Sequence, residues 1–200
     1  ARAAALRKLA VESGLRHAAE RGELGLSYQL QADLTTGEIA GAQVIMNWTS
    51  QTLGSVPGHE FVPIAMQTGL IVMLGDWKRE AVCQQLRAWE QAGVRVPRLS
   101  MRISQLELQQ PDMVDKLRQS LLANGLQAQA LGIEISEQAL FNASPELVQT
   151  LNQLRGLGLE ISLGDFGAGA TNLGLLRTLP VDVIKVHRSC VPDVTAATGD

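Results

Sequence analysis

The spacing of apolar residues changes along the chain. Over residues 1–20 the apolar side chains keep roughly helical spacing, which predicts an amphipathic helix. Residues 26–32 alternate apolar and polar positions as a strand does, residues 35–38 supply turn formers, and residues 39–48 form a second, more apolar run. We therefore expect a leading helix followed by a β-hairpin.

Helices alternate with short apolar strands beyond Gly58. The expected helices are residues 61–67, 75–91, 112–123, 145–156 and 173–179, and the expected strands are residues 98–104, 130–136, 159–163 and 182–186. Strands separated by helices run parallel and are joined by crossovers, so the pattern predicts an α/β barrel or a doubly wound sheet. An eight-stranded barrel typically needs about 250 residues, so this chain would supply about three quarters of one.

Composition excludes several classes of protein. With 46% hydrophobic and 18% charged residues, the chain can bury a sizeable core, which excludes a disordered or fibrous protein. The net charge of −3 offers no broad cationic surface for DNA, RNA or anionic lipid. Cys83 and Cys190 form no CxxC pair, so neither a disulfide framework nor a zinc cluster is indicated.

The chain shows no targeting or membrane segment. It contains no run of about 18 apolar residues and no signal peptide at its start, so we expect a cytoplasmic protein without membrane insertion. The chain opens without Met and ends on the polar residues 194–200. We therefore expect it to be a fragment of a longer protein.

Charged and polar residues gather where the predicted strands end, which is the functional face of a parallel α/β barrel. They are Gln43, Asn47, Arg102, Ser104, Glu134, Glu137, Asp165, Lys185 and His187. A charged group inside a barrel must be paired or bind a ligand, so convergence of Arg102, Glu134, Asp165 and Lys185 would create a phosphate or metal site. The alternative is a structural ion-pair network, in which Glu134 pairs with Lys185 or Arg102. For His187 we favour a structural role.

Taken in order, these segments resemble the EAL domain, the cyclic di-GMP phosphodiesterase fold of bacterial signalling proteins. The segments that carry the resemblance are IAGAQVIMNW (39–48), GHEFVPIAMQTGLI (58–71), LSMRIS (99–104), LGIEISEQAL (131–140) and SLGDFGAGATNLGLLRTLPVDVIKVHRSCV (162–191). The resemblance implies a TIM-like (β/α)8 barrel of EAL type over residues 1–200. Its barrel elements would lie in residues 26–191, with the last strands missing from this chain.

The sequence departs from the family where the family binds metal. By resemblance, Gln43 stands at the signature Glu, Ile45 at its Leu and Asn47 at its Arg. Arg102, Gly164 and His187 stand where the family has an Asn, the first of two Asp residues and a further Asp, whereas Glu134, Asp165 and Lys185 are kept. Hard cations need carboxylate ligands, and the family's hydrolysis resembles two-metal catalysis. We therefore expect no metal, no cofactor, no catalytic residue and no enzyme activity.

Loss of hydrolysis leaves nucleotide binding open, and the resemblance implies cyclic di-GMP as the ligand. Arg102, with Lys185, would neutralise a phosphate in place of the metal. Phe61 and Pro63 would supply an apolar face for a guanine, with ordinary packing at a helix start as the alternative. The expected ligand-binding residues are Gln43, Ile45, Asn47, Phe61, Pro63, Arg102, Ser104, Asp165, Phe166 and Gly167.

Among EAL domains that lack the catalytic set, the GDFG turn and the altered signature strand most resemble the FimX group of type IV pilus regulators. That resemblance implies a receptor module within a longer protein, recruited to a cell pole through other domains and active in twitching motility. The implied partner is a PilZ-domain protein, and a homodimer is left open. The alternatives are a nucleotide-independent interaction scaffold and a weak cyclic di-GMP phosphodiesterase.

Overall fold

The computed structural model describes residues 2–140, 143–168, 176–177 and 179–191. Its strands are β1 (Leu24–Ala32), β2 (Ile39–Ser50), β3 (Gly54–Val56), β4 (Leu99–Arg102), β5 (Leu131–Ser136), β6 (Glu160–Phe166) and β7 (Val183–Val186). Its α-helices are α1 (Arg2–Leu15), α2 (Gly58–Thr68), α3 (Leu70–Gln91), α4 (Gln105–Leu108), α5 (Met113–Ala123), α6 (Glu137–Leu140) and α7 (Pro145–Gly156). Two 3-10 turns, η1 (Ala128–Ala130) and η2 (Arg188–Cys190), complete the described elements.

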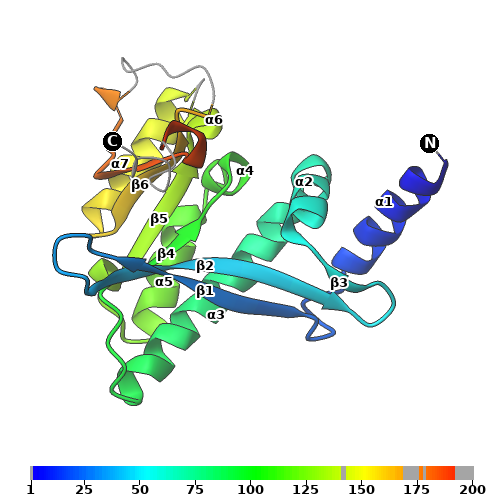
Figure 1. Cartoon of the computed structure of the whole chain (residues 1–200), viewed down its shortest axis with the longest axis horizontal. Helices are drawn as coiled ribbons and strands as arrows, with labels where there is room; N and C mark the ends of the chain where they lie inside the picture. Colours follow the sequence, from blue (N-terminus) through cyan, green and yellow to red (C-terminus); the bar gives the residue numbers. More distant parts are fainter. Residues whose placement is uncertain (1, 141–142, 169–175, 178, 192–200) are drawn as a thin grey trace, which may run out of the picture.

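The described strands form one sheet in the order β1-β2-β4-β5-β6-β7, with β3 paired to β2 (Figure 1). β1 and β2 make the expected antiparallel hairpin, β3 also pairs antiparallel with β2, and strands β4 to β7 join the sheet in parallel. The α/β fold with its mostly parallel sheet is therefore confirmed. Parallel neighbours bring the carboxyl ends of β4 to β7 to the same edge, which positions the site described below.

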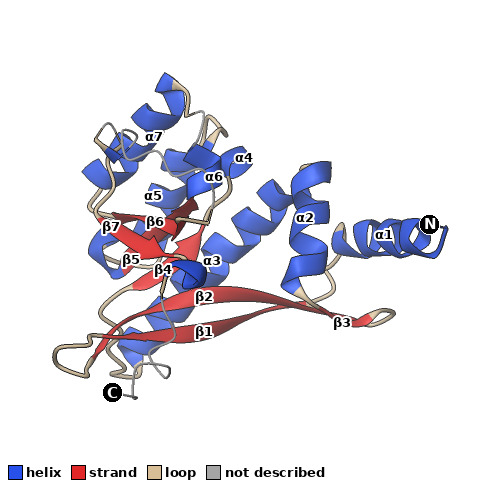
Figure 2. Cartoon of the chain, turned by 45° about the horizontal axis from the view of Figure 1, so that its top comes forward, coloured by secondary structure: helices blue, strands red, loops and turns tan. Residues whose placement is uncertain are grey.

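Alternation along the strands gives the sheet one apolar face and one polar face. The main core lies between the apolar face and helices α3, α5 and α7, and it includes Met101, Ile133 and Leu163 from three successive strands. Figure 2 shows these helices beside the sheet. The opposite face carries Ser100, Glu134 and other polar residues, because side chains two positions apart point to the same side of a strand. The expectation of a sizeable core is confirmed.

A second core cluster surrounds the start of the chain. Val11 and Leu15 of α1 pack with Trp48 of β2 and with residues of α2 and α3. The leading helix ends at Leu15, earlier than the 1–20 predicted, and turns over residues 16–22 lead into β1. Gly22 completes these turns with a positive φ of 65°, which favours glycine.

Three short elements, β3, α4 and α6, were not predicted, and α3 begins at Leu70, five residues earlier than expected. Gly69, with φ 76°, ends α2 and lets α3 begin at once. Most of the helix expected at residues 173–179, and the terminal segment 194–200, lie outside the described residues. Among the helices that the structure describes, none has the length and apolar character needed to span a membrane.

Candidate functional site

Four charged side chains from neighbouring parallel strands meet on the polar face. In the register of the sheet, Arg102 of β4 lies opposite Glu134 of β5. The Arg102 Nη2 atom is 2.7 Å from Glu134 Oε1 and 3.0 Å from Asp165 Oδ2 of β6. From β7, Lys185 Nζ lies 2.5 Å from the other Glu134 oxygen, Oε2. The predicted convergence of these four residues is confirmed.

Glu134 is the centre of this charge cluster, which we define as Arg102, Glu134, Asp165 and Lys185. Its side chain is only 2% exposed, and each carboxylate oxygen accepts a hydrogen bond from a cation. Burial raises the pKa of Glu134, but the hydrogen bonds from Lys185 and Arg102 outweigh burial and hold its pKa below the ordinary value. Glu134 is therefore an ionised carboxylate whose two oxygens are both engaged.

Arg102 forms the exposed side of the charge cluster. Its side chain is 50% exposed, while Nε and Nη2 donate to Glu134. Burial lowers the pKa of Arg102, but the hydrogen bonds and negative charges of Glu134 and Asp165 together outweigh burial, so its pKa lies above the ordinary value. The guanidinium is thus permanently charged, anchored on one side and open to solvent on the other, which suits it to bind an anion.

Gly164 gives Glu134 the room that it occupies. A Cβ atom built on Gly164 would lie 2.6 Å from Glu134 Oε1 and 2.9 Å from its Cδ. Real side chains do not approach this closely, so any larger residue at position 164 would have to displace the Glu134 carboxylate. The glycine and the paired carboxylate belong to one arrangement.

The donor set around the cluster is a poor match for a divalent cation. Within the described residues, no three His, Cys, Asp or Glu side chains are placed to share a metal ion. The two carboxylates of the cluster, Glu134 and Asp165, are bridged by the Arg102 guanidinium. Position 164, which by resemblance would offer another carboxylate, is a glycine.

The glycine turn after β6 is held in place by its neighbours. Asp165 has φ 56°, the only positive φ found at a described residue other than glycine, and Gly167 has φ 89°. The Gly167 N–H donates to Glu137 Oε2 at 3.0 Å, and the Cys190 thiol lies 3.5 Å from the Gly167 carbonyl oxygen. Glu137 therefore anchors the turn that directly follows the end of β6, where Asp165 lies. The position of Glu137 directly after a predicted strand marked it as a candidate residue, but its hydrogen bond with Gly167 could not be inferred from the sequence pattern.

The signature-strand residues lie on the same face but apart from the charge cluster. Gln43 pairs in register with Ser100, and alternation places Ile45 and Asn47 on the side that Gln43 occupies. Gln43 is half-buried, Ile45 is 43% exposed, and Asn47 donates to Ser27 Oγ at 3.0 Å. Among the described residues, no hydrogen bond joins Gln43 or Asn47 to the cluster.

The role expected for Phe61 is wrong. Its side chain has no exposed surface, and its ring packs edge-on against Trp48 with the ring centroids 5.9 Å apart. A guanine could not reach either face of this ring, so the alternative, packing at a helix start, is the one observed. Pro63 is exposed within α2, so its availability to a ligand stays a prediction.

Structural contacts engage two further predicted ligand residues, Ser104 and Phe166, and also His187, for which a structural role was expected. Ser104 Oγ caps α4 by accepting from the Glu107 N–H at 3.2 Å. Phe166 is half-buried and packs against the main core. His187 accepts a hydrogen bond from the Ser189 N–H and caps η2, as a structural histidine would. These contacts leave the ligand roles of Ser104 and Phe166 as predictions.

Comparison with known proteins identifies the family. The EAL domain family matches residues 12–199. The cyclic di-GMP phosphodiesterase NbdA of Pseudomonas aeruginosa is 33% identical over 196 residues, which cover 98% of this chain and 25% of that protein. Curated relatives match over 21% to 31% of their own length, so this chain spans about a quarter of them.

Two solved structures share the fold. The PaMucR phosphodiesterase in its cyclic di-GMP complex is 31% identical with a TM-score of 0.83, over 90% of this chain and 72% of that one. The FimX EAL domain of Xanthomonas citri, in complex with cyclic di-GMP, has a TM-score of 0.85 at 22% identity, over 98% of this chain and 76% of that one. At that lower identity the likeness extends to the fold alone.

Proposed function

Because the chain belongs to the EAL domain family, we propose that it is a receptor domain that binds cyclic di-GMP without hydrolysing it. Support for the ligand comes from PaMucR, whose structure is a cyclic di-GMP complex and whose fold matches over most of both chains. The chain's own charge cluster has the chemistry that a phosphodiester requires, a fixed guanidinium beside a second cation.

The observation that carries the proposal is the pairing of Glu134. Two cations occupy both of its oxygens, and Arg102 also reaches Asp165. A divalent ion bound by these carboxylates would have to displace Arg102 and overcome its repulsion, with Gly164 contributing no ligand. We therefore propose that the site holds no metal, that no cofactor is required, and that no hydrolysis follows.

Arg102 is the residue to which we assign phosphate binding. Its half-exposed guanidinium keeps one side on Glu134 and offers donors on the other side, so binding would need little reordering of the side chain. Lys185 is 24% exposed and shares Glu134, which places a second positive charge near the same phosphate. Together the two cations would balance the charge that metal ions balance in a catalytic site.

We further propose that this domain is of the FimX type, acting in type IV pilus control through a PilZ-domain partner. The support is in the residues: the signature strand carries Gln43, Ile45 and Asn47, and the turn reads Gly164-Asp165-Phe166-Gly167. Overall identity does not favour this group, since the FimX structure of X. citri is 22% identical and PaMucR is 31% identical. The assignment therefore depends on the altered positions.

A second candidate is a weak cyclic di-GMP phosphodiesterase. It is favoured by NbdA, whose name gives it that activity and which is 33% identical to this chain. Such an activity would require Glu134 and Asp165 to release Arg102 and take up a metal. The receptor and the enzyme therefore differ in their response to divalent cations.

The deciding experiment is calorimetric titration of cyclic di-GMP into the chain, with Mg²⁺ and again with EDTA, followed by analysis of the recovered nucleotide. A receptor gives equal affinity in both buffers and returns intact ligand. A linear dinucleotide that forms only with Mg²⁺ would establish the enzyme instead. No binding in either buffer would contradict both and favour a nucleotide-independent scaffold.

A further inference from the structure

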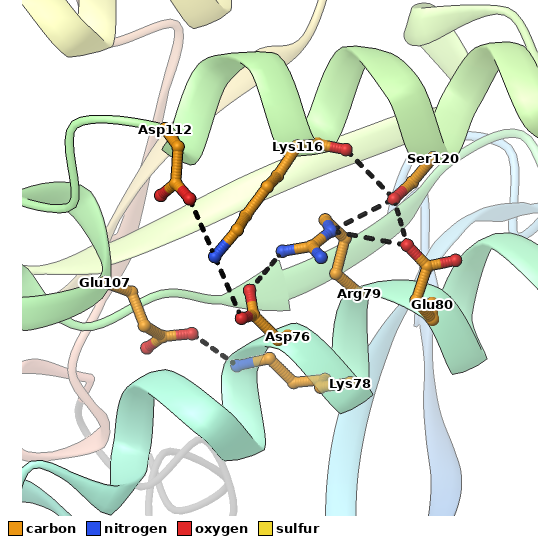
Figure 3. A network of polar contacts seen from close by, with 8 residues as sticks. All are labelled: Asp76, Lys78, Arg79, Glu80, Glu107, Asp112, Lys116 and Ser120. Atoms are coloured by element: carbon orange, nitrogen blue, oxygen red, sulfur yellow. Dashed lines mark hydrogen bonds and ion pairs between the residues drawn. The ribbon is translucent and has the colours of Figure 1, made fainter.

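A lysine of α3 is buried directly behind the charge cluster. Lys78 is 8% exposed, and its Nζ donates to the backbone carbonyl oxygen of Arg102 at 2.5 Å. The same ammonium lies 3.5 Å from Glu107 Oε1 of α4 (Figure 3). Burying an ammonium is costly unless it is paired and hydrogen-bonded, and Lys78 has both kinds of partner. Helix α3 is thus tied to the last residue of β4, whose side chain enters the charge cluster.

Glu107 extends this link to the turn after β4. It is 5% exposed, and its Oε2 accepts from the Ser104 N–H at 2.7 Å, while Ser104 Oγ accepts from the Glu107 N–H. Helix α3 can approach Glu107 closely enough for Lys78 to pair with it because residue 75 is glycine. A Cβ atom at this position would lie only 2.1 Å from Glu107 Oε1. Residues 102–107 are therefore fixed at both ends by one buried ion pair.

We propose that Lys78 and Glu107 are positioning residues for nucleotide binding, which hold the end of β4 so that the Arg102 guanidinium points into the charge cluster. The inference rests on the proposed cyclic di-GMP site. Lys78 donates only to the backbone of Arg102, and it lies beside Met101 and Ile103, whose side chains point to the apolar face of the sheet, so it acts through Arg102. A strand end held on both faces keeps the guanidinium in one direction, which lowers the cost of ordering it on binding.

The neighbouring residue on α3 provides a matched control. Arg79 is 7% exposed, nearly the same as Lys78, but its bonds go to Asp76 within α3 and to Ser120 of α5. Asp76 in turn pairs with Lys116 of α5 (Figure 3). Arg79 therefore joins α3 to α5, whereas Lys78 joins α3 to β4 and α4. A purely structural role for buried charge on α3 would make the two residues equivalent.

Removal of one or both charges separates stability from positioning. Lys78→Met leaves Glu107 buried without its cation, which is destabilising, whereas adding Glu107→Gln removes the unpaired charge and should recover most of the lost stability. Neither variant restores the Lys78 ammonium that donates to the Arg102 carbonyl. The double variant should therefore regain thermal stability without regaining the orientation of Arg102.

The test uses the full chain and the variants Lys78→Met, Lys78→Met/Glu107→Gln and Arg79→Met. The readouts are the melting temperature, the affinity for cyclic di-GMP by calorimetry, and the NMR resonance of the Arg102 side-chain Nε–H group. That resonance is assigned by its absence in Arg102→Ala. It reports the Arg102 hydrogen bonds to Glu134 whether or not nucleotide binds.

We expect Lys78→Met to move the Arg102 resonance and to weaken affinity roughly tenfold, the scale of one lost hydrogen bond that orients a charged group. The double variant should keep both effects despite its recovered melting temperature, and Arg79→Met should lower only the melting temperature. An unmoved Arg102 resonance in folded Lys78→Met, or full affinity in the double variant, overturns the inference. If wild type binds no nucleotide, the proposed function fails, and the resonance still decides the positioning role.

Discussion

At the scale of single residues, the charge on Arg102 does two things that are usually separate. It satisfies a buried carboxylate, Glu134, and it presents half of its own surface to solvent. A buried carboxylate with only Lys185 as partner would be less well compensated, so Arg102 supports the fold as well as the proposed ligand. Because Arg102 has both functions, the effect of substituting it must be compared with the effect of substituting another cation of similar exposure elsewhere in the fold.

Arg102→Ala should weaken cyclic di-GMP binding by about 1 to 3 kcal/mol, because a charge-assisted hydrogen bond to phosphate is lost. The matched control is Arg98→Ala. Arg98 precedes the other end of β4, its side chain is 36% exposed, and it pairs with Glu160. Calorimetry on both variants, with circular dichroism to establish folding, is the measurement. Unchanged affinity in a folded Arg102→Ala protein would remove Arg102 from the ligand site, as would an equal loss in both variants.

At the scale of elements, the packing of β5 against β6 depends on Gly164, which has no side chain. Ser136 pairs with Gly164 in register, and the Glu134 carboxylate lies next to the position that a Cβ atom of residue 164 would take. The glycine therefore determines how deeply Glu134 can sit between Arg102 and Lys185. By resemblance to the family, an aspartate at this position would compete with Glu134 for the same space.

Gly164→Ala should destabilise the domain by about 1 to 3 kcal/mol, because overpacking forces the Glu134 carboxylate away from its cations. Gly25→Ala is the control, since Gly25 also lies in a strand but a Cβ there meets nothing within 4 Å. Urea denaturation of both variants measures the difference. Equal stability of the two variants would show that the Glu134 carboxylate can move aside at no cost.

Sequence reasoning found the elements that have a clear period and missed those that do not. The hairpin and the parallel strands follow from alternation and from the helices between them, and β5 lies within one residue of its predicted bounds. The strand β3 and the helices α4 and α6 have three or four residues each, too short for a period to be recognised. Sequence pattern also cannot separate a buried ring from one that stacks on a ligand, which is why Phe61 was misassigned.

The charge cluster, too, was predicted from the sequence only in part. Its members were predicted because strand ends meet at one edge of a parallel sheet, a rule of topology that needs no coordinates. The contacts of Lys78 and Glu137 were not predicted, since both side chains reach residues on other elements, 24 and 30 positions away along the chain. Such pairs depend on how helices pack against the sheet, and no short spacing in the sequence marks them.

At the scale of the whole molecule, ionised carboxylates hold together parts that are distant in sequence. Glu23 accepts from the Trp48 indole N–H and the Gln51 backbone N–H, and these bonds lower its pKa. Burial raises the pKa of Asp76, but hydrogen bonds from Arg79 and Lys116 outweigh burial and leave it lowered. Carboxylates with lowered pKa values therefore lie in three parts of the fold. Glu23 lies beside Trp48 of the second core cluster, Asp76 lies between α3 and α5, and Glu134 lies in the charge cluster.

Stability should therefore decrease cooperatively in acid. A carboxylate with a lowered pKa stabilises the fold fully above its ordinary pKa, which is 4.5 for Glu134, and this contribution is lost as the pH falls through the lower folded value. Urea unfolding at a series of pH values from about 7 down to about 3 should show a steep loss in the acidic half. Glu134→Gln should be less stable at neutral pH and should lose less on acidification, because one of the protonating groups is gone. Parallel pH dependence in wild type and Glu134→Gln would mean that Glu134 has the same pKa in the folded and unfolded chain. The cations around it would then only balance the cost of burying its charge.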